Sequence, residues 1–255
     1  MKEHRHLIDN RSNEDSGNSS DISSAKDEHI RAWDLPTRLF KWSLVALIIT
    51  AWISSGFDDP EMVVHKLVGY GILILIVFRV LWGFVGSTTA RFSNFVRSPS
   101  IISNYLKALR RNRAEHYLGH NPVGGVMVIG LLLACGVQGL LGLFASDGVT
   151  AAGPFADAAG DTISSWAASV HATWFYIAIV GLACVHIATN LYYQLIKRDN
   201  LIGAMITGRK KRVSYVERDE ARGGSLFAAA ICLIVAAGLV FGTITLFGGT
   251  FFNAT

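Results

Sequence analysis

Residues 163–195 form a stretch that is almost free of charge and holds two histidines, His171 and His186. Their spacing suits two metal or haem ligands. The stretch is longer than the ~20 residues that a bilayer-spanning helix needs. Fifteen residues at about 1.5 Å each separate the histidines by roughly 22 Å along a helix, and they lie only about 60° apart around its axis. Both side chains are therefore expected to face one interior, one toward each side of a membrane.

An ionisable side chain at such a depth is costly and usually marks a functional site. Two buried imidazoles at two depths suggest two ligand positions, for a metal or for a stack of haems. The alternative is that the rings hydrogen-bond to neighbouring helices or line a polar cavity. This stretch alone leaves both interpretations open.

The three cysteines offer no further chemistry. Cys135, Cys184 and Cys232 each fall inside an apolar run, and the chain has neither a CxxC nor a CxxCH motif. Iron–sulfur ligation and covalent haem attachment therefore find no support. We expect the cysteines to serve as small buried apolar side chains.

The composition indicates a membrane protein. Of the 255 residues, 51% are hydrophobic and only 16% are charged, and this balance is typical of membrane chains. The net charge of +4 would suit nucleic acid, but the basic residues sit beside the apolar runs, which membrane topology explains better. Membrane lipid is therefore an expected partner and nucleic acid is not.

Five apolar runs predict five transmembrane helices. They cover about residues 36–56, 62–85, 122–146, 163–195 and 226–247. The third is rich in glycine, which lets a neighbouring helix or a flat cofactor approach closely, and helix packing is the expected use. The fifth holds neither charge nor histidine, so we assign it an anchoring or packing role.

The charges of the links predict the orientation of the helices. The links 57–64 and 147–162 carry acidic residues and no Lys or Arg, whereas the links 86–121 and 197–224 are basic. The positive-inside rule then places the N-terminus and the basic links in the cytoplasm and the C-terminus outside. The prediction is five spans, N-in and C-out.

This topology brings histidines from different helices to the same depth. His65 begins the second span on the outer side, and His171 lies near the outer start of the fourth. Neutral imidazoles from two helices can bind a haem iron from its two faces, with the porphyrin in the apolar gap. Ligation would also satisfy two buried polar rings.

The inner side offers less complete chemistry. His186 lies there, and the first span presents Lys41 rather than histidine opposite it. His116 and His120 are in the adjacent loop, where we expect them to cap a helix or contact lipid phosphate. Arg79 lies among apolar residues near the inner end of its span, where its charge needs water or an anion. It therefore either snorkels to the cytoplasm or pairs with a haem propionate.

Several segments occur in an order that resembles one family. They are AWDLPTRLFKW (32–42), HKLVGY (65–70), FRVLWGFVG (78–86), ARF (90–92), YLGHNP (117–122) and DNLIGAMITGR (199–209). With the helix that holds the two histidines, they resemble the bacterial cytochrome b561 family, which includes the b-type cytochrome subunits of membrane-bound nickel–iron hydrogenases. The resemblance covers about residues 32–212.

The resemblance implies an all-α membrane protein of the bacterial inner membrane. Residues 31–212 would form a four-helix transmembrane bundle that holds haem b, and residues 213–255 a linker and an extra fifth helix. Residues 1–30 are polar and are predicted to be a disordered extension. The implied activity is electron transfer between a quinone pool and a partner redox protein, such as a c-type cytochrome or a hydrogenase.

Carried over to this sequence, His65 and His171 match the outer haem's ligands and His186 matches one inner ligand. The family's other inner ligand is the histidine of an Arg-Leu-Phe-His-Trp motif, and here Lys41 stands in its place. We therefore expect one haem b and an altered second site. Three outcomes stay open: an empty inner site, a neutral Lys41 amine as ligand, or a five-coordinate haem on His186.

Three functions compete at this point. The leading hypothesis is a b-type cytochrome that carries single electrons, in which haem supplies the redox chemistry and the protein the ligands and the dry pocket. A non-catalytic membrane anchor or assembly subunit is the alternative, motivated by Lys41. A proton or solute transporter that uses the buried histidines and Arg79 has the least support, because the sequence shows no inverted repeat or pair of broken helices.

Overall fold

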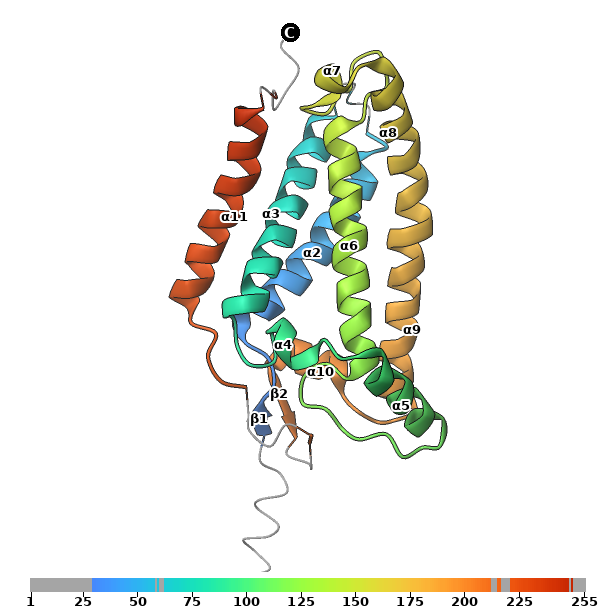
Figure 1. Ribbon diagram of the computed structural model, residues 1–255, viewed down its shortest axis with the longest axis vertical. Coiled ribbons are helices and arrows are strands. Elements are labelled where there is room, and N and C mark those ends of the chain that lie inside the picture. The colour runs from blue at the N-terminus through green and yellow to red at the C-terminus, as the bar shows by residue number, and fades with distance from the viewer. Residues whose placement is uncertain are drawn as a thin grey trace, which may run out of the picture.

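Five helices long and apolar enough to cross a bilayer run side by side in a computed structural model that describes residues 29–57, 59, 62–211, 215–216, 221–247 and 249 (Figure 1). They are α2 (Leu35–Ser54), α3 (Val63–Val85), α6 (Pro122–Phe144), the continuous helix α8 (Asp161–Trp174), η1 (Phe175–Val180) and α9 (Gly181–Leu195), and α11 (Leu226–Leu246). The five predicted spans are therefore confirmed, each within two residues at both ends.

Two of the helices begin with side-chain caps that the sequence encodes locally. The Thr37 backbone N–H donates to Asp34 Oδ1 at 2.6 Å at the start of α2. The Gly124 N–H donates to Asn121 Oδ1 at 2.7 Å at the start of α6. Each cap satisfies a backbone donor that the helix leaves free, and each helix has proline in its first turn, where no N–H is needed.

Short elements close the two ends of the bundle. One end, here called the basic end, carries α4 (Phe92–Phe95), α5 (Pro99–Arg110), α10 (Leu201–Thr207), and the strands β1 (His29–Arg31) and β2 (Arg209–Lys211). The opposite end, here called the acidic end, carries α7 (Ala156–Ala159) and the link with Asp147.

The small sheet corrects the predicted extent of disorder. Strand β1 pairs antiparallel with β2, with Ile30 opposite Lys210, so residues 29 and 30 are ordered rather than part of a disordered extension. Ile30 is buried together with Trp33 and Leu118, and this apolar contact holds the strand. The remainder of the predicted extension, residues 1–28 with His4 and His6, lies outside the described residues.

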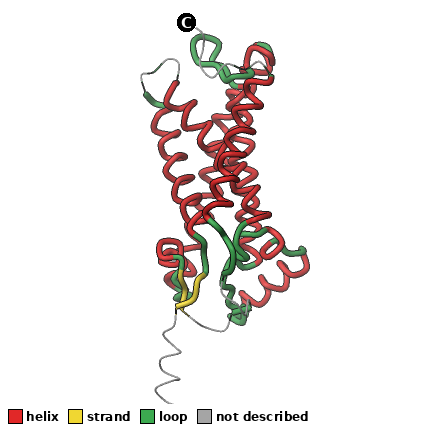
Figure 2. Tube along the Cα trace, turned by 90° about the vertical axis from the view of Figure 1, so that its left-hand side faces the viewer, coloured by secondary structure: helices red, strands yellow, loops and turns green. Residues whose placement is uncertain are grey.

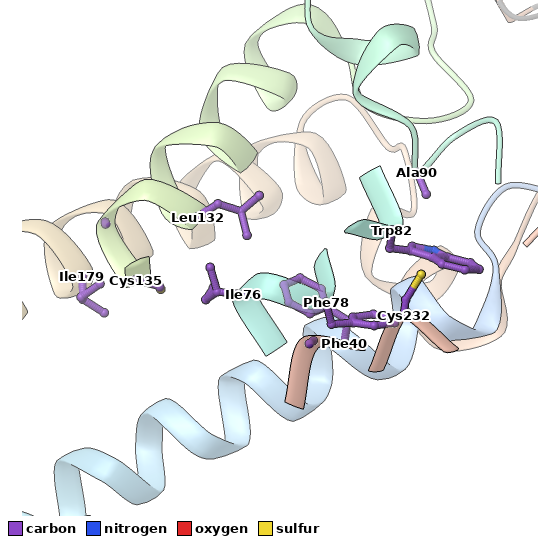
Figure 3. Close-up of a cluster of buried hydrophobic side chains, with 11 residues drawn as sticks. Phe40, Ile76, Phe78, Trp82, Ala90, Leu132, Cys135, Ile179 and Cys232 are labelled. Carbon is purple, nitrogen blue, oxygen red and sulfur yellow. The ribbon is translucent and has the colours of Figure 1, made fainter. Parts of the chain in front are cut away.

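Helix α3 is the central element of the bundle. Helices α2, α6 and α11 pack against it, which gives the fifth span the packing role that was predicted, and α8 packs on α6. A buried cluster joins these helices, including the stacked rings of Phe78 and Trp82, 5.9 Å apart (Figure 3). Cys135 and Cys232 lie in this cluster, as expected, but Cys184 is exposed, which corrects that prediction.

The fourth span is the least packed of the helices. Its second half, α9, contacts α6, η1 and α10 and contains no buried residue, and Figure 2 shows the long helices from the side. The π-helical turn η1 was not predicted and lies between His171 and His186. Such a turn holds about one residue more than an α-helical turn, so the fifteen residues between the histidines act as about fourteen helical steps. The two side chains then lie about 40° apart around the axis and still share a face.

Candidate functional site

His65 from the first turn of α3 and His171 from α8 lie opposite each other near the acidic end. Their ring centroids are 6.1 Å apart and their planes make an angle of 77°. Nδ1 of His65 lies 2.9 Å from the backbone oxygen of Ala51. Nδ1 of His171 lies 2.9 Å from the backbone oxygen of Gln138. The structure thus brings together the two residues that sequence analysis placed at one depth.

The hydrogen bonds fix the chemistry of these two rings. A carbonyl oxygen can only accept, so each Nδ1 donates and each Nε2 keeps the lone pair that a metal needs. An imidazole nitrogen binds a metal at about 2 Å, which puts the centroids of two rings on opposite sides of one iron about 6 Å apart. The observed separation of 6.1 Å fits two imidazoles on one iron.

Two neighbours on α6 shape the space around His171. The side-chain amide nitrogen of Gln138 lies 3.1 Å from Nε2 of His171, while the amide oxygen is buried without a partner among the described residues. This amide therefore occupies the lone pair that a metal would take, and it has to turn away on ligation. A Cβ on Gly142 would stand 3.1 Å from Cε1 of His171, so glycine at this position makes room for the ring.

His186 and Lys41 share no hydrogen bond, although the charge of Lys41 acts on the His186 ring. His186 is exposed, and its helix α9 contains no buried residue. No hydrogen bond to its ring is found in the described part of the chain. Nζ of Lys41 lies 3.2 Å from Sδ of Met205 and 4.4 Å from the centre of the Trp33 ring. The Lys41 amine thus lies against Met205 and Trp33 and makes no hydrogen bond to His186.

Arg79 is buried, with only 1% of its surface exposed. Its Nη2 donates to the backbone oxygen of Ala90 at 3.0 Å, and its guanidinium carbon lies 5.2 Å from the ring centre of Phe92 and 5.7 Å from that of Phe95. Its Nη1 has no partner among the described residues. The prediction that Arg79 snorkels is thus wrong, and its pairing with a propionate stays a prediction.

His120 is the residue whose setting the sequence analysis misjudged. Its ring lies 4.7 Å from that of Trp33 and 4.8 Å from that of Phe95, and neither ring nitrogen has a partner in the described structure, although both are buried. Its nitrogens are thus buried rather than at the surface where a lipid phosphate was expected, and Asn121 rather than His120 caps α6.

Several physical causes keep the His120 ring neutral. Burial lowers the pKa of His120 well below its ordinary value, and the positive charges of Lys41 and Arg79 lower it further. Trp33 and His120 lie in two separate segments that carry the family resemblance, and Phe95 lies outside them. Their convergence in space, however, is a tertiary property.

The chain matches one protein-family model over most of its length. The family model described as prokaryotic cytochrome b561 matches residues 32–208, well over half of the chain. No curated protein and no solved structure matches the chain. The matched region includes α2, α3, α6 and the fourth span, and it ends before α11.

Proposed function

This chain belongs to the prokaryotic cytochrome b561 family, and from that membership we propose that it carries single electrons between a quinone pool and a partner redox protein through a haem b held by His65 and His171. The family membership makes it a multi-pass bacterial membrane protein and a b-type cytochrome that transfers electrons. The ligands, the quinone and the partner are the proposed part.

One observation supports the choice of ligands above all others. His65 and His171 come from different helices, their centroids are 6.1 Å apart, and both Nδ1 atoms are tied to backbone carbonyl oxygens. Such second contacts hold a ligating ring in one tautomer and one orientation. Haem b, when bound, supplies the one-electron chemistry. The chain's own residues on α3, α6 and α8 orient the two rings.

We further propose that the basic end faces the cytoplasm and the His65–His171 pair lies near the outer face. The distribution of Lys and Arg supports this orientation. A periplasmic or membrane redox partner, such as a c-type cytochrome or a hydrogenase, would then approach from the acidic end. Lys41, in the position of a family ligand, makes the second site at His186 an altered one.

The test is a dithionite-reduced minus oxidised spectrum of the purified chain, with variants of each ligand. We expect the α-band of a low-spin b haem, and we expect its loss in His65→Leu and in His171→Leu. His116→Leu, which changes an exposed histidine, is the matched control and should keep the band. A purified chain without any such band would refute the electron-carrier function and favour a membrane anchor.

A further inference from the structure

Three nitrogen-bearing side chains meet around Trp33 and Phe95 at the basic end. Nζ of Lys41 lies 4.4 Å from the ring centre of Trp33, and the His120 ring lies 4.7 Å from the same indole. On the other side, His120 and Arg79 share Phe95, at 4.8 Å and 5.7 Å. Lys41, His120 and Arg79 thus form a continuous arc, here called the donor cluster.

The donor cluster lacks acceptors. Both ring nitrogens of His120 and Nη1 of Arg79 are buried without a partner in the part of the chain that the structure describes. The only hydrogen bond from Lys41 found there is to the sulfur of Met205, which is a weak acceptor. Buried polar atoms are normally paired, and a cation buried without a counter-charge is strongly unfavourable.

One buried acid, Asp34, is near enough for its charge to act on both Lys41 and Arg79, so a single carboxylate faces two cations. Asp34 is fully buried, its Oδ1 accepts from the Thr37 N–H at 2.6 Å, and its Oδ2 accepts from Nε1 of Trp82 at 3.3 Å. The ion pair of Lys210 with Asp199 involves no member of the donor cluster. No carboxylate of the described chain therefore bonds to the donor cluster.

The donor cluster lies near the ring of His186 without bonding to it, because the charge of Lys41 acts on His186 and His186 acts in turn on His120. Asn121, next to His120, donates its side-chain N–H to the hydroxyl of Tyr193 at 3.1 Å. Tyr193 lies seven residues beyond His186 on the same helix, which is roughly 10 Å or two turns nearer the basic end. His120 is thus offset toward the basic end from His186, on the side where acidic groups at the edge of a flat macrocycle would have to lie to meet the cluster.

We propose that Lys41, Arg79 and His120 bind the carboxylates of a second haem, and that this haem has His186 as its only protein ligand. The inference rests on the proposed function and deepens it. Nζ of Lys41 is directed to Met205 and Trp33, so the lysine has exchanged the ligand role of its family position for that of a carboxylate anchor. The second haem then keeps one open face, where a small neutral donor such as imidazole binds.

The first experiment measures the open face on the purified holo-chain. We expect two haems per chain, one with a low-spin and one with a high-spin EPR signal. Added imidazole should convert the high-spin signal to low-spin and leave the haem on His65 and His171 unchanged. His186→Leu should remove the high-spin haem alone.

The second experiment tests the carboxylate contacts. The full apo-chain is loaded with haemin or with haemin dimethyl ester, whose propionates can no longer ionise. Since a hydrogen bond to a charged group contributes about 1.5 to 3 kcal/mol, Lys41→Met and His120→Phe should each weaken haemin binding at the second site roughly ten- to a hundredfold. Both should leave ester binding unchanged. Exposed Lys107 and His116 provide the controls, Lys107→Met and His116→Phe.

Each other outcome has a definite meaning. The inference is overturned if wild-type chain binds ester and haemin equally at this site, or if the variants weaken both compounds alike, as general misfolding would. It is also overturned if the second haem is low-spin and Lys41→Met makes it high-spin, because Lys41 is then the ligand. A chain with one low-spin haem refutes the inference but not the proposed function, whereas a chain without haem refutes the proposed function itself.

Discussion

Replacing Gly142 by alanine should weaken the His65–His171 site without unfolding the bundle. Gly142 lies one turn after Gln138 on α6, so both residues face the ring of His171. The new Cβ would stand 3.1 Å from Cε1 of His171, whereas carbon atoms in contact prefer about 3.5 to 4.0 Å. The ring would therefore have to retreat by roughly 0.4 Å.

The ring cannot retreat freely, because Nδ1 of His171 is bonded to the Gln138 backbone at 2.9 Å. A retreat of that size stretches this bond toward about 3.3 Å, beyond the usual range for a hydrogen bond. Overpacking of this kind costs about 1–3 kcal/mol, and alanine returns up to about 1 kcal/mol through its higher helix propensity. The apo-chain should thus lose on the order of 0–2 kcal/mol of stability, while a misplaced ligand weakens low-spin haem binding roughly tenfold or more.

The assay is a haemin titration of the apo-chain followed at the low-spin band, with thermal unfolding measured in parallel. Gly136→Ala is the matched control on the same helix, because its Cβ would meet Cγ2 of Ile76 at an ordinary 4.0 Å. Equal haemin affinities and equal spectra for Gly142→Ala and Gly136→Ala would show that His171 is not held where the ligand role requires it.

Three further predictions concern the caps, the acidic-end link and the topology. Asp34→Ala removes the cap of α2 and an acceptor for Trp82, so thermal unfolding should show a loss of about 1–2 kcal/mol, whereas Asp157→Ala at an exposed position should be silent. Backbone N–H groups, that of Val149 first, hold the pKa of Asp147 below its usual value; its stabilising effect is present above the ordinary pKa and is lost as pH falls through the lowered one, so Asp147→Asn should flatten the acid limb of stability against pH. Alkaline phosphatase fused within the link that holds Asp157 should be active and within the link after α5 inactive; the reverse pattern would contradict the N-in orientation.

The helices were predictable because their determinants are local. A run of about twenty apolar residues, a capping Asp34 or Asn121 and a proline in the first turn define a span without any knowledge of its neighbours. The meeting of His65 with His171 followed from the same information, because alternating link charges fix the direction of each helix and hence the depth of each side chain.

What the sequence could not provide depends on tertiary contacts. The π-helical turn η1 has no composition of its own, and strand β1 forms only because Ile30 finds a buried place beside Trp33 and Leu118. His120 was predicted at the surface because only loop residues surround it along the chain. In space, Trp33 and Phe95 from two other segments cover its ring.

His171 and His186 of the fourth span differ in the hydrogen-bonding groups that surround them. At the level of His171, the neighbouring backbone supplies acceptors for both Nδ1 atoms, and the Nε2 of His171 is covered by the Gln138 amide, which can turn away. Near His186 the surroundings supply donors, from Arg79 and His120, and no described carboxylate pairs with them. A Lys41 ammonium would worsen that imbalance if the site were empty, because a further buried cation needs a further anion. A lysine at this position is therefore easier to accommodate with an acidic ligand present than without one.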